Sequence, residues 1–386
     1  MPHRFSKLEK LGLALRLTCI APWQIFASVL RSLLIAWTRG IPARLFLVCA
    51  VIKVVLETFS PRQIQYLSLS TKEAYKSWIR RRIAKAKKLG DPTDAPRLRY
   101  DWQPLDDGHS SLLWIGNRRE AKKVVLFLHG GGYICPLLPG HLEWCWRAYV
   151  AAGIEMKTEV AVAVLEYTLC PEARYPVQLR QAASALAYLL SQKFRPQDIV
   201  IGGDSAGANL TAQLLCHLIE PHPTVREVIL SEPLLGAFLV SPWVTRCTND
   251  ASFTENTWID MLSNPTVNKS TRELLGPGID DTHRTSASLA FPLDRDKSCL
   301  EGMTSILKRI YVSVGAHEVL RDQGIALVRE IRYLNPKLNV HFDMQTRQAH
   351  DFILLEGQEE RDGECIQRMK GWTKDLLAMR IQQGPE

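Results

Sequence analysis

The chain has 386 residues, of which 46% are hydrophobic, and it carries a formal net charge of +8. This composition excludes a disordered chain and provides for one sizeable core. The charge is uneven, because residues 1–90 hold 17 Lys and Arg against 3 Asp and Glu. These cations alternate with apolar stretches and no nucleic-acid motif is present, so an anionic membrane surface is favoured over nucleic acid as a partner.

Two apolar stretches, residues 11–38 and 41–56, open the chain. The first is interrupted by Arg16 and Arg31, and the second also contains cations. A Lys or Arg at the centre of a membrane span costs about 2.5–3.5 kcal/mol. We therefore predict a helix pair that lies on a membrane or caps the rest of the chain, with a single anchor through residues 17–37 as the alternative.

A capping box at Ser70–Glu73 predicts the next helix, which Gly90-Asp91-Pro92 should end. Beyond a boundary near residue 95, strand and helix patterns alternate, as in a mostly parallel sheet flanked by helices. The predicted strands are 100–104, 111–116, 124–128, 160–165, 199–201, 237–240, 310–314 and 340–344. The predicted helices are 141–152, 177–193, 206–219, 322–333 and 363–380.

Four segments follow from this alternation. We predict a cationic and apolar N-terminal arm over residues 1–95 and the first part of an α/β core over 96–242. The alternation lapses between residues 243 and 305, which we interpret as a cap insertion, and the second part of the core follows over 306–386. The arm and the insertion should fold together as a helical lid.

The strongest motif is Gly203-Asp204-Ser205-Ala206-Gly207. It follows an apolar run typical of a strand and precedes a stretch typical of a helix, which is the context of a nucleophile elbow. Small residues on both sides of Ser205 let the strand and the helix approach closely. The pattern therefore predicts Ser205 as a nucleophile at a helix N-terminus.

A second motif, His129-Gly130-Gly131-Gly132-Tyr133, directly follows the predicted strand 124–128. Three glycines let the backbone fold around an oxygen and offer it N–H donors. Nine cysteines are scattered without a CxxC pair, and no nucleotide-binding glycine loop is present. We therefore expect neither a metal nor a cofactor.

These two motifs, together with the block Tyr167–Pro176 between them, resemble the hormone-sensitive lipase group of α/β-hydrolases over roughly residues 95–386. The resemblance implies an α/β-hydrolase fold with a helical cap. It also implies an oxyanion hole built from the N–H groups of Gly131, Gly132 and Ala206. His129 would then support the glycine loop instead of acting as the base.

The partners of Ser205 should follow it in the order acid and then histidine. His350 follows the predicted strand 340–344, in a position where the resembled group carries HxF. Glu318 follows the strand 310–314 in an ExLxD pattern, where that group usually has DxLxD. The longer glutamate can still reach a histidine, and Asp322 is the alternative acid.

The expected activity is hydrolysis of carboxylic esters with a short acyl group on a lipophilic alcohol. The basic N-terminal extension resembles fungal steryl acetyl hydrolases and esterases of secondary metabolism. Acyl transfer, thioester cleavage or lactone cleavage with the same residues stays open, and so do a ligand receptor and a membrane-interaction protein. An intracellular location on a membrane face is expected.

Overall fold

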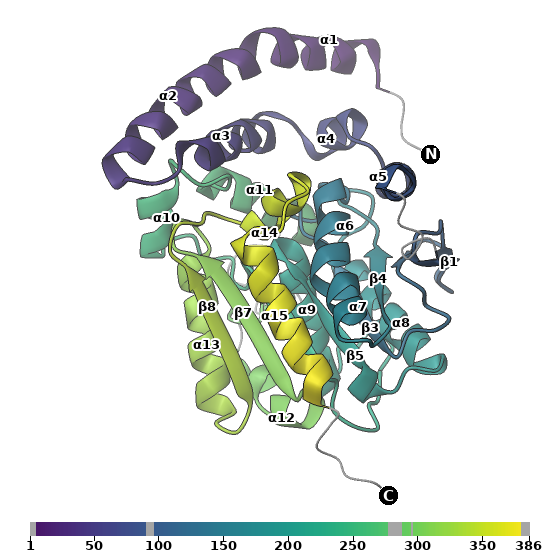
Figure 1. The fold of residues 1–386 in the computed structure, drawn as a ribbon. Coiled ribbons are helices and arrows are strands. Elements are labelled where there is room, and N and C mark those ends of the chain that lie inside the picture. The colour runs from purple at the N-terminus through teal and green to yellow at the C-terminus, as the bar shows by residue number, and fades with distance from the viewer. Residues whose placement is uncertain (1–4, 90–95, 277–287, 295, 380–386) are drawn as a thin grey trace, which may run out of the picture.

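The computed structural model describes residues 5–89, 96–276, 288–294 and 296–379. The predicted boundary near residue 95 and the helix stop at Gly90-Asp91-Pro92 lie outside the described residues. Eight strands form one sheet in the order β1-β2-β4-β3-β5-β6-β7-β8 (Figure 1). Their bounds are β1 Trp102–Pro104, β2 Ser111–Ile115, β3 Lys123–Leu128, β4 Val160–Glu166, β5 Ile199–Asp204, β6 Gly236–Val240, β7 Arg309–Gly315 and β8 Asn339–Gln345.

The sheet is antiparallel only at one edge, where β2 pairs with β1 and β4. The other six strands are parallel, so their carboxyl ends meet at one edge of the sheet. All eight predicted strands are present with small shifts at their ends. The predicted α/β-hydrolase fold class is therefore confirmed.

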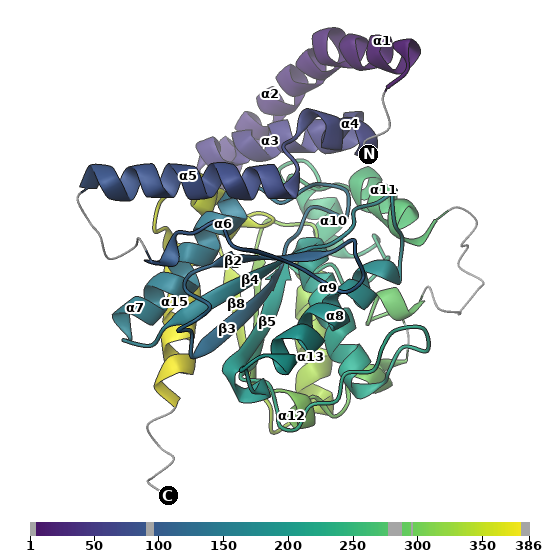
Figure 2. The same ribbon diagram turned by 90° about the vertical axis from the view of Figure 1, so that its right-hand side faces the viewer.

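Helices cover both faces of the sheet (Figure 2). Alternate residues of a strand face opposite sides of the sheet. Leu126 of β3 belongs to a hydrophobic cluster that includes residues of α8, α9 and α13, whereas Phe127 belongs to a second cluster that includes residues of α6, η3, α14 and α15. Burial on both faces explains why the central strands are continuous apolar runs. The covering helices are α6 Pro139–Cys145, η3 Trp146–Val150, α7 Ala151–Glu155, α8 Val177–Ser191, α9 Ser205–Ile219, α13 Arg321–Leu334, α14 Phe352–Gln358 and α15 Glu364–Ala378.

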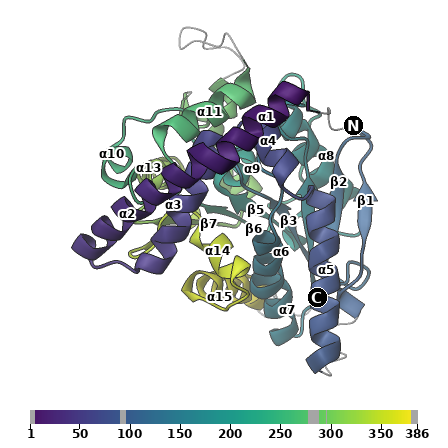
Figure 3. The same cartoon turned by 90° about the horizontal axis from the view of Figure 1, so that it is seen from above.

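The N-terminal arm is entirely helical in its described part. Seen from above, α1 and α2 form a long rod that crosses the top of the molecule over α3 and α4 (Figure 3). The rod begins at Lys7, a few residues before the predicted apolar stretch. The bounds are α1 Lys7–Leu15, η1 Arg16–Ile20, α2 Ala21–Arg39, α3 Ala43–Thr58, α4 Pro61–Leu67 and α5 Thr71–Leu89.

The insertion contributes helices and no sheet strand within the described part of residues 243–305. It contacts α3 of the arm directly: Lys269 Nζ donates to the carbonyl of Leu56 at 2.6 Å, and Ser263 Oγ donates to the Glu57 carboxylate at 2.5 Å. Arm and insertion thus lie together above the carboxyl ends of the parallel strands. The elements are α10 Ala251–Asn256, α11 Asn264–Leu275, η5 Ser288–Ala290, η6 Lys297–Leu300 and α12 Met303–Ile306.

Candidate active site

Ser205 stands at the sharp turn between β5 and α9. Its φ of +50° is in the left-handed region, which costs energy for a residue with a side chain. Gly203 and Gly207 make the turn feasible, because a Cβ at these positions would lie 1.8 and 1.9 Å from the carbonyl oxygen of Leu128. The motif Gly203–Gly207 therefore forms the sharp strand-to-helix turn that the sequence predicts.

His350 lies against this serine. Its Nε2 atom is 2.9 Å from Ser205 Oγ, and its side chain is buried in the loop between β8 and α14. Burial lowers the pKa of His350 to about 3. The imidazole is thus neutral near pH 7 and can accept the serine proton.

Glu318 approaches the other side of the same imidazole. Its Oε2 atom lies 3.8 Å from His350 Nδ1, and both side chains are buried. Oε2 accepts hydrogen bonds from Ser241 Oγ at 2.6 Å and Gly315 N at 3.1 Å. Among the described residues, Glu318 Oε1 and His350 Nδ1 have no hydrogen-bond partner. Burial raises the pKa of Glu318 well above 4.5, while the hydrogen bonds from Ser241 and Gly315 oppose that rise.

Asp322, the alternative acid, makes other contacts. It lies in the first turn of α13, where Leu320 is the N-cap. Its carboxylate accepts from the backbone N–H of Ser252 at 2.8 Å and from Arg321 Nε at 2.8 Å. The bond from Ser252 ties α13 to the insertion, whereas Arg321 belongs to α13 itself.

The glycine loop after β3 has a left-handed backbone, which glycine adopts without steric cost. Gly131, Gly132 and Tyr133 have φ values of +103°, +61° and +60°. Gly130 N donates to Asp204 Oδ2 at 3.0 Å, which joins this loop to the elbow. Within the described residues, no protein acceptor pairs with the N–H groups of Gly131 and Gly132, so both remain available to an oxygen of a substrate.

His129 supports this loop from beneath. Its ring stacks on Tyr167 with centroids 4.4 Å apart, and its Nδ1 lies 2.8 Å from the Gly130 carbonyl oxygen. Tyr167 Oη donates to the His129 carbonyl at 2.7 Å. Burial lowers the pKa of His129 to about 4, so this residue is an uncharged part of the packing.

A buried polar cluster that the sequence analysis did not predict lies beside the site. His141, Asp204 and Asp351 come from α6, the elbow and the turn after His350, and their ligand atoms lie within 4.8 Å of one another. His141 Nδ1 accepts from Leu138 N at 3.1 Å, so its ring proton is at Nε2 and points to Asp204, 3.1 Å away. Both ring nitrogens are therefore used in hydrogen bonds, and the cluster links the histidine turn to the elbow.

A cavity of about 110 Å³ opens above these groups. Ser205, His350, Gly131 and Gly132 line it from the sheet side. Its remaining walls are predominantly apolar and come from α3, the glycine loop, the insertion and α14; they include Ile52, Leu56, Ile134, Met261, Val267 and Leu354. The cavity can therefore hold an apolar group against the serine.

Comparison with known proteins identifies the fold family of the chain. A family model described as alpha/beta hydrolase fold matches residues 125–354. An acetyl-hydrolase of Streptomyces hygroscopicus is 29% identical over 220 residues, which are 57% of this chain and 65% of that protein. An arylacetamide deacetylase of Oryctolagus cuniculus is 23% identical over 278 residues, again 65% of its length. The chain thus spans slightly less than two thirds of each of these relatives.

Solved structures share the fold. Carboxyl esterase 2 from the fungus Tuber melanosporum has a TM-score of 0.57 at 18% identity and covers 71% of this chain and 83% of its own. An esterase from the bacterial hormone-sensitive lipase family has a TM-score of 0.56 at 24% identity and covers 81% of this chain and 100% of its own. The chain belongs to the alpha/beta hydrolase fold family, in its hormone-sensitive lipase-like group.

Proposed function

We propose that the protein is a serine esterase in which Ser205 is the nucleophile, His350 the general base and Glu318 the acid. The observation that carries this proposal is the 2.9 Å contact between His350 Nε2 and Ser205 Oγ at a strained elbow. A positioned base within hydrogen-bond reach is what activates a serine, which is a weak nucleophile at its ordinary pKa.

The reaction follows from these positions. His350 takes the Ser205 proton as Oγ attacks the ester carbonyl, and the N–H groups of Gly131, Gly132 and Ala206 stabilise the oxyanion. The imidazolium then gives its proton to the leaving alcohol, and the acyl group stays on Ser205. Water activated by the same histidine releases the acyl group as an acid.

Glu318 stabilises the imidazolium that forms in this reaction. The side chains must approach by about 1 Å to make a hydrogen bond of ordinary length. Such bonds are often long before substrate binds and shorten in the reacting complex.

The proposed substrate is an ester with a short acyl group on a lipophilic alcohol. The apolar cavity walls support the lipophilic part, and relatives named acetyl-hydrolase and deacetylase support the short acyl group. Transfer of the acyl group to an alcohol or amine, or cleavage of a thioester or lactone, would use the same residues. Product analysis with and without an added acceptor alcohol separates these reactions from hydrolysis.

Labelling with a fluorophosphonate probe tests the nucleophile. The wild-type protein should be labelled and should hydrolyse p-nitrophenyl acetate, whereas Ser205→Ala should do neither. Ser110→Ala removes a buried hydroxyl before β2, away from the site, and is the matched control. Labelling that persists in folded Ser205→Ala would overturn the proposal.

The acid is tested separately. Glu318→Ala should lower kcat on the order of 10²–10⁴-fold, since loss of the orienting acid in a serine triad has an effect of this size. Asp322→Ala should leave kcat within a few-fold of the wild-type value. The opposite result would assign the acid to Asp322.

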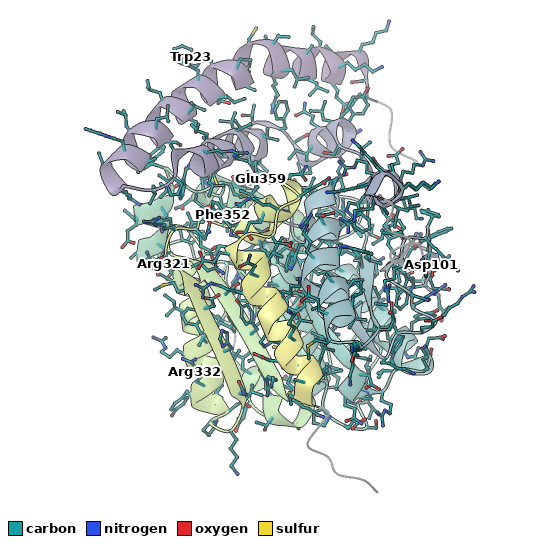
Figure 4. The ribbon with its side chains drawn as sticks, in the orientation of Figure 1. Trp23, Asp101, Arg321, Arg332, Phe352 and Glu359 are labelled. Atoms are coloured by element: carbon teal, nitrogen blue, oxygen red, sulfur yellow. The ribbon has the colours of Figure 1, made fainter. Side chains whose placement is uncertain are left out.

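We further propose that the N-terminal arm contacts an anionic membrane surface. The helix Lys7–Arg39 is long and apolar enough to cross a membrane, and only 17% of its most apolar window is buried. Its small residues Ala21 and Ala36 face the protein, while Trp23 and Trp37 are 70% and 83% exposed and Trp23 points away from the domain (Figure 4). Large apolar residues face outward along its whole length: Leu8, Leu11, Leu15, Trp23, Phe26, Leu30, Leu34 and Trp37.

Contacts of α2 with the insertion favour a helix that lies on the membrane over one that crosses it. Arg31 stacks over the Trp258 ring at 4.0 Å, and Arg39 Nη2 donates to the Glu255 carbonyl at 2.8 Å. A spanning orientation would break these contacts. Glu9 is the acidic residue of helix Lys7–Arg39, and it pairs with Arg62 at 3.0 Å. Cations flank the exposed stripe, which favours binding to anionic lipids.

Sedimentation with vesicles tests this orientation. The protein should bind vesicles of anionic phospholipid and dissociate at high salt, and Trp23→Glu should weaken binding. Tyr333→Glu changes an equally exposed aromatic residue on α13 and is the matched control. Retention of the wild-type protein in carbonate-washed membranes would instead indicate an anchor through residues 17–37.

A further inference from the structure

Asp260 is a buried carboxylate that the reaction described above does not use. It lies in the turn between α10 and α11 of the insertion, with 1% of its surface exposed. Its Oδ2 accepts from the backbone N–H of Val319 at 2.7 Å. Its Oδ1 accepts from the N–H of His350 at 3.1 Å and from that of Met261 at 2.7 Å.

Two of these donors belong to the loops that carry the proposed base and acid. One is Val319, which directly follows Glu318 in the loop after β7. The other is His350 itself, in the loop after β8. A single carboxylate therefore holds both loops at the residues where their relative position decides the distance between His350 Nδ1 and Glu318 Oε2. This distance is 3.8 Å, so a small shift of either loop decides whether the hydrogen bond forms.

The insertion also holds the opposite side of the acid loop. Ser252 Oγ donates to the Val319 carbonyl at 2.6 Å, and Asn256 Nδ2 donates to the Glu318 carbonyl at 3.0 Å. The peptide group between Glu318 and Val319 is thus bonded on its carbonyl side by α10 and on its N–H side by Asp260. Among these insertion residues, Asp260 alone also reaches His350.

We propose that Asp260 is a positioning residue that fixes the acid and the histidine relative to each other through the backbone of their loops. This inference rests on the proposed esterase function. Asp260 is not among the residues that line the cavity, whereas its neighbours Met261 and Leu262 are. Its loss should therefore lower kcat and leave KM nearly unchanged.

The charge of Asp260 gives the role a pH dependence. Burial raises the pKa of Asp260 to about 7, while its backbone hydrogen bonds and the charge of Lys53 oppose that rise. A protonated carboxyl group has a donor where the loops need acceptors, so one loop bond is lost as the pH falls below about 7. The titratable groups that face Asp260 are Cys49 and Lys53 of α3, Glu318 after β7, and His350 and Asp351 after β8.

Lys53 connects this pH dependence to the N-terminal arm. Its ammonium group donates to the carbonyl of Thr257, three residues before Asp260. The opposite charges of the Lys53 and Asp260 side chains attract each other. Removing this cation should make the ionised form of Asp260 less favourable. The acidic limb of activity should then move to higher pH.

The first experiment compares Asp260→Asn with wild type on p-nitrophenyl acetate. We expect kcat to fall on the order of 10–100-fold with KM within twofold, because an amide can accept only at one of its two polar atoms. Asp198→Asn alters another buried Asp, bonded to Lys123 at the opposite end of β5, and should change neither value. Wild-type kcat in folded Asp260→Asn would overturn the inference.

The second experiment measures kcat against pH in the wild type and in Lys53→Met, and it does not require a folded Asp260 variant. The wild-type rate should decrease as the pH falls below about 7, because Asp260 becomes protonated there. The pKa of His350, about 3, is too low for this histidine to cause the decrease. Lys53→Met should move the limb upward, and an unshifted limb would contradict the inference. Fluorophosphonate labelling that persists in Ser205→Ala would instead contradict the proposed function and leave these backbone contacts as they are.

Discussion

The carboxyl ends of the parallel strands, here called the catalytic edge, and the N-terminal arm are both rich in apolar residues. These residues are buried at the catalytic edge, whereas many of them are exposed on the arm. At the carboxyl ends of the parallel strands, the buried strands β5 and β7 lead into Ser205 and Glu318, whose side chains contact His350 and Ser241 on neighbouring loops. On helix Lys7–Arg39 of the arm, small residues such as Ala21 and Ala36 face the protein, and most of the large apolar residues face outward. Burial thus fixes the chemistry in one region, while exposure leaves the other free to meet a lipid surface.

The largest expected effect removes the chemistry and keeps the fold. Ser205→Ala and His350→Ala should each lower kcat/KM by on the order of 10⁴-fold or more, and the double variant should lose little beyond either single one. The two residues act on one proton, so their losses are not additive. Initial rates with p-nitrophenyl acetate and thermal unfolding measure both properties. Additive losses in the double variant would show that the residues act independently.

A pair of tryptophans compares the two regions by stability. Trp144 is fully buried against one face of the sheet, beside Phe127 and Phe238. Trp144→Ala should lower the free energy of unfolding by about 3–5 kcal/mol. Trp23→Ala should change it by less than about 0.5 kcal/mol, because this side chain is 70% exposed. Urea unfolding measures both values. A large loss for Trp23→Ala would mean that α2 packs against protein instead of facing lipid.

A buried histidine makes the stability of the catalytic edge depend on pH. Burial lowers the pKa of His129 in the folded protein to about 4, from 6.5. The unfolded chain therefore takes up the proton first, and the stability present above pH 6.5 is lost as the pH falls to about 4. For one buried histidine the loss is about 3 kcal/mol.

Urea unfolding at pH 7.5 and pH 5 checks this sign. His129→Gln should lose less stability than wild type between the two pH values. His341→Gln, which changes an exposed histidine of β8, should match wild type. A wild-type pH slope in His129→Gln would mean that other groups cause the loss.

Local patterns explain why so much of this edge could be predicted. The central strands are continuous apolar runs bounded by turns, and the elbow is encoded in five consecutive residues around Ser205. The glycine loop is equally local. Each of these predictions needs only the conformations that neighbouring residues permit, so one sequence is sufficient.

The residues that were missed meet only in the folded chain. Asp260 lies 90 positions before His350, and His141 lies 63 positions before Asp204. An aspartate in a polar insertion has no sequence pattern that distinguishes a buried acceptor from an exposed charge. The orientation of α2 was also open, because apolar periodicity predicts an apolar face without saying whether protein or lipid covers it.

The smallest expected effect separates the membrane surface from the chemistry. Trp23→Glu should hydrolyse the water-soluble p-nitrophenyl acetate at the wild-type rate, because Trp23 does not line the cavity. With a long-chain ester dissolved in anionic vesicles, the same variant should be several-fold slower, since fewer enzyme molecules reach the surface. Tyr333→Glu should match wild type on both substrates. Equal slowing on both substrates would mean that the arm shapes the active site itself, and the contrast between the two regions would then fail.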